Sequence, residues 1–273
     1  MPKLLVPTDF SAGSAAAARY AFALARDLRC GLELLHAYRA PRKAGSLIDV
    51  EEHMERGVHD DFGAFVEGLR ADVPAGMAVH RRTERRDADD AVSHVLRLEG
   101  DEVVAVVMGT HGETAAERAL AGSTTQKVID AIDHPLFAVP EAYVGATIGP
   151  RRVLWAVDAD TAPEPRFCAL AADFARREGG ALVFYHAGAA GGVPAERLRA
   201  LAGRADYTVA ADPDANDATA GILAAADAAA ADLIVVTHGT GGFLSRLFGT
   251  STTGETLRRT RLPVLVLPRA AAG

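Results

Sequence analysis

The chain contains two copies of one sequence pattern, and this internal repeat constrains its fold more than any other feature. The segment Leu4–Asp9 returns as Val153–Asp158, and Leu34–Ala37 returns as Phe184–Ala187. Further matched pairs, in the same order along the 273 residues, are Val106–Gly112 with Ile234–Gly239, Ser123–Thr125 with Ser251–Thr253, and His134–Pro140 with Leu262–Pro268. A duplicated pattern of this length predicts two domains of the same fold.

We place the first domain at residues 1–142 and the second at residues 151–270. The segment between them contains Gly145, Gly149 and Pro150, which is typical of a linker. The second copy is shorter in its middle, where only 194–201 is left of its second helix.

Within each copy, short apolar runs alternate with helical patterns. Runs that are apolar throughout indicate strands buried on both faces, and therefore a parallel sheet. In the first copy we expect strands at Leu4–Pro7, Leu32–His36, Met77–His80, Val103–Met108 and Leu136–Val139, and helices at 11–29, 48–70, 88–98 and 123–132. Gly31 is expected to stop the first helix in a left-handed conformation. The pattern predicts an α/β fold: two tandem five-stranded parallel-sheet domains, doubly wound, with helices on both faces.

Composition narrows the class of protein. The net charge of −7 disfavours nucleic acid as a partner, and the basic cluster within 81–86 is interpreted as an exposed loop. Cys30 and Cys168 form no recognisable pair, which favours reduced thiols. No apolar run reaches the ~20 residues that span a membrane, and no signal peptide is recognised. We therefore expect a cytoplasmic protein that binds neither membranes nor nucleic acid.

A candidate site lies where strands of the first copy end. In doubly wound sheets, ligands bind beyond the carboxyl ends of the strands. Pro7-Thr8-Asp9 leaves the first strand, His36-Ala37 leaves the second, and a long loop leaves the fourth. In that loop Gly109 and Gly112 are followed, after nine residues, by Gly122-Ser123.

This spacing suits a phosphate. Glycines let the backbone approach an anion closely, and the free amides at the start of a helix can hold phosphate oxygens. The hydroxyls of Ser123, Thr124 and Thr125 can add donors. Asp9 can accept from a ribose hydroxyl or help to hold Mg²⁺.

Each half of the chain resembles a universal stress protein domain. The segments that carry the resemblance are Val6–Ser11, Leu34–Ala37 and the stretch from Met108–Gly112 through Gly122-Ser123. The resemblance implies the adenine nucleotide alpha hydrolase-like fold and a bound ATP, AMP or ADP, with Mg²⁺ as an accompanying ion. Asp9 would contact the ribose beside Pro7, Ala37 and Met108 would line the adenine, and the glycines would shape the phosphate loop. The implied binding residues are Pro7, Thr8, Asp9, Ala37, Met108, Gly109, Gly112, Gly122, Ser123, Thr124 and Thr125.

The resemblance also implies a regulatory protein of the stress response rather than an enzyme. It implies that the two domains pair through their fifth strands, with Phe137 and Leu265 near the seam. A homodimer and an unidentified protein partner stay open, and the alternative function is a nucleotide-independent adaptor acting through protein contacts. An ATPase or nucleotidyl transferase is disfavoured because no general base or second acidic pair stands at a defined position.

The second copy departs from the pattern, so we expect a weaker or absent nucleotide site there. Val236 is assigned to the place of Gly109, whereas Gly239 is kept. The counterpart of Gly122 is open. Counting nine residues from Gly239 gives Gly249, whereas aligning the Ser-Thr-Thr segments of the two copies puts Thr250 at that position. Because of the extra Gly241-Gly242 pair, an altered anion-binding loop in the second copy stays an alternative.

Several polar residues have a structural interpretation as well. Four histidines occur at equivalent positions of the two copies. Because no metal-binding spacing accompanies them, we interpret them as hydrogen-bonding residues at strand ends rather than as a metal site. They are His36, His111, His186 and His238. Asp9 can cap the following helix, and Ser11 and Ser14 are expected to cap it rather than to act as nucleophiles.

Overall fold

The protein is described here by a computed structural model that covers residues 1–39, 47–110, 123–143, 149–157, 161–187, 191–212, 217–238 and 260–270. The chain divides into two compact units, Met1–Ile132 and Asp133–Gly273. The division falls before the predicted boundary at 142, because strand β5 (Leu136–Val139) pairs with a strand of the second unit.

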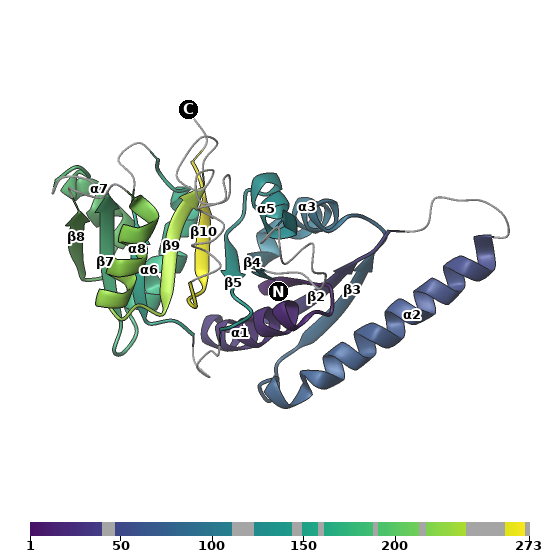
Figure 1. Cartoon of the computed structure of the whole chain (residues 1–273). Helices are drawn as coiled ribbons and strands as arrows, with labels where there is room; N and C mark the ends of the chain where they lie inside the picture. The colour runs from purple at the N-terminus through teal and green to yellow at the C-terminus, as the bar shows by residue number, and fades with distance from the viewer. Residues whose placement is uncertain are drawn as a thin grey trace. The chain divides into compact units, whose positions relative to one another are not determined.

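The first unit alternates strands and helices as the sequence predicts (Figure 1). Its elements are β1 (Lys3–Thr8), α1 (Ala12–Leu28), β2 (Gly31–Ala37), α2 (Leu47–Gly68), β3 (Val79–Glu84), α3 (Ala88–Glu99), β4 (Val103–Gly109) and α5 (Ser123–Ala131), with short 3-10 turns at Arg70–Asp72 and Gly100–Glu102. The strands lie in the order β3-β2-β1-β4, and the pairings of β1 with β2, β1 with β4 and β2 with β3 are parallel. Leu4, Leu5 and Val6 are fully buried, as expected of a strand covered on both faces.

The second unit repeats this arrangement. Its elements are β5, β6 (Arg152–Ala156), α6 (Pro165–Ala175), β7 (Ala181–Ala187), α7 (Ala195–Ala202), β8 (Tyr207–Asp212), α8 (Ala218–Ala228), β9 (Leu233–His238) and β10 (Val264–Pro268). The strand order is β5-β10-β9-β6-β7-β8. All pairs are parallel except β5 with β10, where Phe137 lies opposite Leu265. The doubly wound α/β fold predicted from the sequence is therefore confirmed, and α7 has 8 residues where α2 has 22.

The third strand of the first unit was predicted in the wrong place. It spans Val79–Glu84 rather than Met77–His80, so Arg81 and Arg82 belong to a strand and not to an exposed loop. Met77 instead closes a turn through its amide, which donates to the carbonyl of Pro74. The hydrophobic pattern of the sequence does not indicate this strand, because half of its residues are exposed and carry polar side chains.

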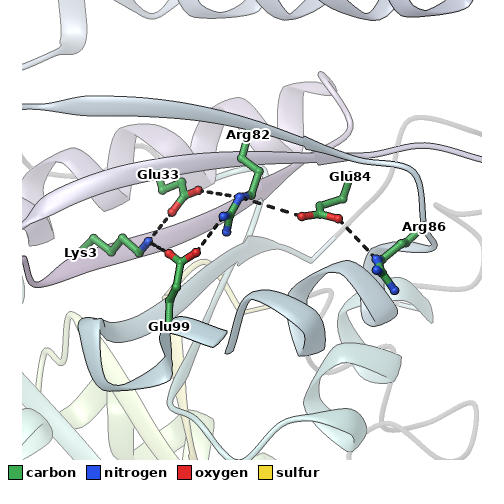
Figure 2. A network of polar contacts seen from close by, with 6 residues as sticks. All are labelled: Lys3, Glu33, Arg82, Glu84, Arg86 and Glu99. Atoms are coloured by element: carbon green, nitrogen blue, oxygen red, sulfur yellow. Dashed lines mark hydrogen bonds and ion pairs between the residues drawn. The ribbon is translucent and has the colours of Figure 1, made fainter. Parts of the chain in front are cut away.

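Arg82 belongs to a network of ion pairs that joins three strands to a helix (Figure 2). Glu33 on β2 is buried between Lys3 on β1, at 2.6 Å from Nζ, and Arg82 on β3, at 3.3 Å from Nε. Glu99, at the end of α3, pairs with Lys3 and, at 2.7 Å, with Arg82. Hydrogen bonds from Lys3 and then Arg82 hold the pKa of Glu99 below its ordinary value. The network therefore ties α3 to the edge of the sheet.

The end of the first helix also differs from expectation. Arg29, not Gly31, adopts the left-handed conformation, with φ of 54°. Its amide and that of Cys30 donate to carbonyls of the last turn, at Arg26 and Ala25. Gly31 instead begins β2. A non-glycine residue in this conformation is uncommon, which is why the glycine was the natural prediction.

The two units pack an equivalent helix on an equivalent strand with different side chains. Tyr185 on β7 stands where the first unit has Leu35, because they face Ala156 and Pro7 in the same register. A Cβ added to Gly221 on α8 would lie 1.9 Å from the Tyr185 hydroxyl. The corresponding residue of α3 is Ala91. The larger tyrosine is therefore accommodated by the loss of one methyl group.

Two further predictions bear on the class of protein. Among the described residues, no helix is long and apolar enough to cross a membrane. Both cysteines are free, and burial raises the pKa of each thiol to about 11. The thiols are therefore protonated near neutral pH.

Candidate functional site

The first polar feature at the carboxyl ends of the strands is the turn that follows β1. The hydroxyl of Thr8 accepts from the amide of Phe10 at 3.0 Å and donates to the hydroxyl of Ser14 at 3.0 Å. Ser14 in turn donates to the carbonyl of Ser11. Thr8, Ser11 and Ser14 are all buried, so these bonds fix the path of the chain from β1 into α1.

Asp9 lies exposed in this turn. Its Oδ1 atom accepts from the amide of Ser11 at 3.1 Å and from its hydroxyl at 2.6 Å. Ser11 caps the helix by accepting from the amide of Ser14, as the sequence predicts. Asp9 thus takes part in the turn before α1, and both of these bonds use a single carboxylate oxygen. An exposed carboxylate held in this way can still accept a hydrogen bond from a ligand hydroxyl.

Phe10 adopts a left-handed backbone conformation, with φ of 66°. Its ring stacks on His36 with centroids 4.2 Å apart and also contacts Phe62 and Phe65 of α2. The conformation costs free energy in a non-glycine residue, and the ring contacts offset it. This aromatic cluster holds the end of β2 against the turn that carries Asp9.

The histidines at the strand ends make the hydrogen bonds expected of them. His36 Nδ1 lies 2.8 Å from the carbonyl oxygen of Thr8, so that nitrogen carries the proton. In the second unit, His186 Nδ1 lies 3.2 Å from the carbonyl of Val157, the counterpart of Thr8. The structural interpretation is confirmed for these two residues, and within the described ranges no group of three metal-binding side chains forms. His111 lies outside the described residues.

Gly109 ends β4 against the first turn of α1. A Cβ at this position would lie 2.7 Å from both the carbonyl carbon and the oxygen of Gly13, and 3.2 Å from the amide nitrogen of Ser14. Contacts this short with a helix backbone cannot be relieved by a side-chain rotation. The close approach of β4 to α1 is therefore sufficient reason for a glycine here, whether or not an anion binds.

The start of α5 lies at the same end of β4. Thr125 is buried, and its hydroxyl donates to the carbonyl of Gly109 at 2.8 Å. That proton is engaged within the protein, whereas the neighbouring Thr124 is exposed. The structure thus brings the first turns of α1 and α5 to the end of β4.

The other predicted site residues are distributed around this corner. Pro7 and Met108 are buried and Ala37 is half-buried, each at or beside the end of its strand. Ser123 begins α5, but its side chain lies outside the described residues, as do Gly112 and Gly122.

Sequence reasoning missed two residues, Phe10 and Gly13. The sequence signal for Gly13 was a glycine in the first turn of a predicted helix. Its closeness to Gly109 at the end of β4 appears only in the structure. Phe10 carried no periodic signal, because its contacts come from residues far away in the sequence.

The second unit places a different residue at the position of Gly109 from the one predicted. In the strand registers Leu5 faces Val106, and its counterpart Leu154 faces Ile234. Counting along both strands brings Thr237, not Val236, to the place of Gly109. Among the described residues, the first helix after β6 begins at Pro165, whereas α1 begins at Ala12, four residues after β1 ends at Thr8. Asp158 and the glycines after His238 lie outside the described residues.

Comparisons with known proteins agree with this architecture. The sequence profile of the universal stress protein family matches residues 1–140. A universal stress protein of Archaeoglobus fulgidus DSM 4304 has 18% sequence identity and a TM-score of 0.69, with 98% of each chain covered. A functionally unknown protein of Pseudomonas aeruginosa PAO1 has 14% identity and a TM-score of 0.57, with 98% of this chain and 93% of that chain covered. No curated protein shows significant similarity to the chain.

Proposed function

Because the chain belongs to the universal stress protein family, we propose that its first unit binds an adenine nucleotide and that the protein acts as a nucleotide-responsive regulator. ATP is the nucleotide we propose, with Mg²⁺ bound alongside its phosphates. The observation that carries the proposal is the exposed carboxylate of Asp9, held by Ser11 in the turn between β1 and α1 at the carboxyl end of the sheet.

The chemistry of this corner divides into a nucleoside side and a phosphate side. Asp9 is the acceptor for a ribose hydroxyl, and Ala37 and Met108 offer apolar surface to the base. Gly109, Gly112 and Gly122 belong to the loop that holds the phosphates. On the phosphate side, the amides at the start of α5 and the exposed hydroxyl of Thr124 are the donors.

Thr8 and Thr125 contribute indirectly. Their hydroxyls are buried and bonded to Ser14 and to the carbonyl of Gly109, so they position the turn and the helix that face the ligand. This differs from the direct contact that the resemblance implies, because a proton already donated inside the protein is not available to a phosphate oxygen.

A regulatory role fits these groups better than turnover. Binding needs only positioned donors and an acceptor, whereas hydrolysis also needs a base aimed at the attacking water. We propose that the protein works in the cytoplasm, and that nucleotide binding to the first unit changes its contacts with a protein partner. The pairing of the two domains through their fifth strands belongs to the same proposal.

Equilibrium dialysis of the full chain against ATP, with and without Mg²⁺, tests the proposal. Asp9→Ala should weaken binding about tenfold to a hundredfold, the usual effect of removing a hydrogen bond to a charged group. Asp158→Ala is the matched control, because Asp158 occupies the equivalent sequence position of the second copy, and it should leave the affinity unchanged. Absence of binding at millimolar ATP would contradict the proposal and favour a nucleotide-independent adaptor.

A further inference from the structure

Each unit ends its sheet in an equivalent edge strand, β3 in the first and β8 in the second (Figure 1). Among the described strands each has one neighbour, β2 for β3 and β7 for β8. The exposure pattern along their six residues is identical, with the first, fourth and sixth residues half-buried and the others exposed. An edge strand presents backbone N–H and C=O groups that a further strand can pair with.

The two edges differ in charge. β3 carries Arg81, Arg82 and Glu84, and Figure 2 shows Arg82 turned toward Glu33 and Glu99. Charged side chains on an edge, and especially charges that point inward, prevent pairing with another strand. β8 has the sequence Tyr-Thr-Val-Ala-Ala-Asp, in which only the last residue is charged.

The registers show which residues replace the arginines. Arg81 faces Leu34 on β2, and Val209 faces Phe184, the counterpart of Leu34, on β7. Val209 therefore occupies the place of Arg81, and Ala210 the place of Arg82. Val209 is 52% exposed. Among the described residues, the other large hydrophobic side chains that are exposed are Met1 and Leu98.

We propose that β8 is an interaction edge that pairs antiparallel with β8 of a second copy of this chain. When two identical strands pair around a two-fold axis, the central residue faces its own copy, because paired side chains must share a face of the sheet. In β8 that central residue is Val209 or Ala210, and either can face itself without repulsion. In β3 the equivalent central residue is an arginine, and like charges directly opposite each other are destabilising.

The same comparison explains why the second unit, and not the first, provides this edge. The ion pairs of Arg82 use an inward-pointing charge at β3, and β8 has alanine in its place. The new contact consists of one backbone ladder and a small apolar patch, so the dimer is weak and dissociates on dilution.

Sedimentation velocity of the full chain over a range of concentrations tests the proposal. The wild type should show a concentration-dependent dimer, and Val209→Arg should weaken it by about tenfold or more. The valine contact is lost in either register, and where Val209 is the central residue the two arginines also face each other. Leu98→Arg is the matched control, because it places the same charge on another exposed apolar side chain, at 66% exposure on α3. It should dimerise like the wild type. Circular dichroism confirms that both variants are folded.

Hydrogen exchange supplies a second readout that does not depend on a variant. Backbone amides of β8 should exchange more slowly at high than at low protein concentration, while those of β3 should not change. A chain that stays monomeric at every concentration would overturn the proposal. So would a dimer that Val209→Arg leaves intact, or protection that appears away from β8.

Discussion

Replacing Gly109 with alanine should destabilise the first unit in the absence of any ligand. The added Cβ would lie 2.7 Å from two backbone atoms of Gly13 and 3.2 Å from a third atom, the amide nitrogen of Ser14. Ordinary contacts between such atoms are about 3.5–4.0 Å, so the first turn of α1 would have to move by roughly 1 Å. Overpacking of this kind costs about 1–3 kcal/mol. We expect about 2–3 kcal/mol, because the atoms belong to a helix backbone and not to a side chain.

Urea unfolding followed by circular dichroism, in buffer without nucleotide, measures this change. Gly63→Ala is the matched control, because Gly63 lies within α2 and a Cβ there has no atom within 4 Å. It should raise the free energy of unfolding by about 0.5–1 kcal/mol, the usual gain from replacing a helical glycine with alanine. If Gly109→Ala were as stable as the wild type but bound ATP less well, the glycine would serve the ligand and our packing argument would be wrong.

Three further predictions concern packing and charge. Thr125→Val should lower the free energy of unfolding by about 1 kcal/mol, because the half-buried carbonyl of Gly109 loses the hydrogen bond that the buried Thr125 hydroxyl donates; equal stability in urea would contradict this. The pKa of Glu99 lies below its ordinary value of 4.5, so its ion pairs stabilise the fold above that pH and the stabilisation is lost as pH falls through the lower, folded-state pKa. Removing one of its two partners in Lys3→Met should therefore make stability fall less steeply on acidification, and an unchanged acid profile would refute the role of the pair. Gly221→Ala should destabilise the second unit by about 1–3 kcal/mol. Adding Tyr185→Leu, which restores the leucine–alanine combination of the first unit, should recover much of this loss in a double-mutant cycle. Additive losses would contradict the predicted compensation.

Much of the fold could be predicted because the repeat and the buried strands leave a strong local signal. The first helix, the last helix of the first copy and strand β5 lie where periodicity predicts them. β3 does not give such a signal. Its alternate residues face solvent, and the ion pairs that hold Arg82 come from residues distant in the sequence. The position of β3 therefore depends on tertiary contacts that a local pattern cannot contain.

The candidate site divides in the same way. The Pro-Thr-Asp turn and the start of α5 were identified from residue types and spacing, and the structure puts Gly109 and Thr125 in direct contact. The reason for Gly109 was not accessible from the sequence, because it depends on how closely α1 passes β4. The assignment of Val236 failed for a related reason. One residue fewer in the second copy can be placed at several positions in an alignment, and only the strand register puts Thr237 at the equivalent place.

Hydrogen exchange of the full chain with and without ATP tests the central claim most directly, because it locates a ligand without altering any residue. If the nucleotide binds at the carboxyl ends of β1 and β4, exchange should slow in residues 9–15, at the end of β4 and in the first turn of α5, while 161–175 stays unchanged. Unaltered exchange at those positions under saturating ATP, or slowing confined to the second unit, would contradict the account.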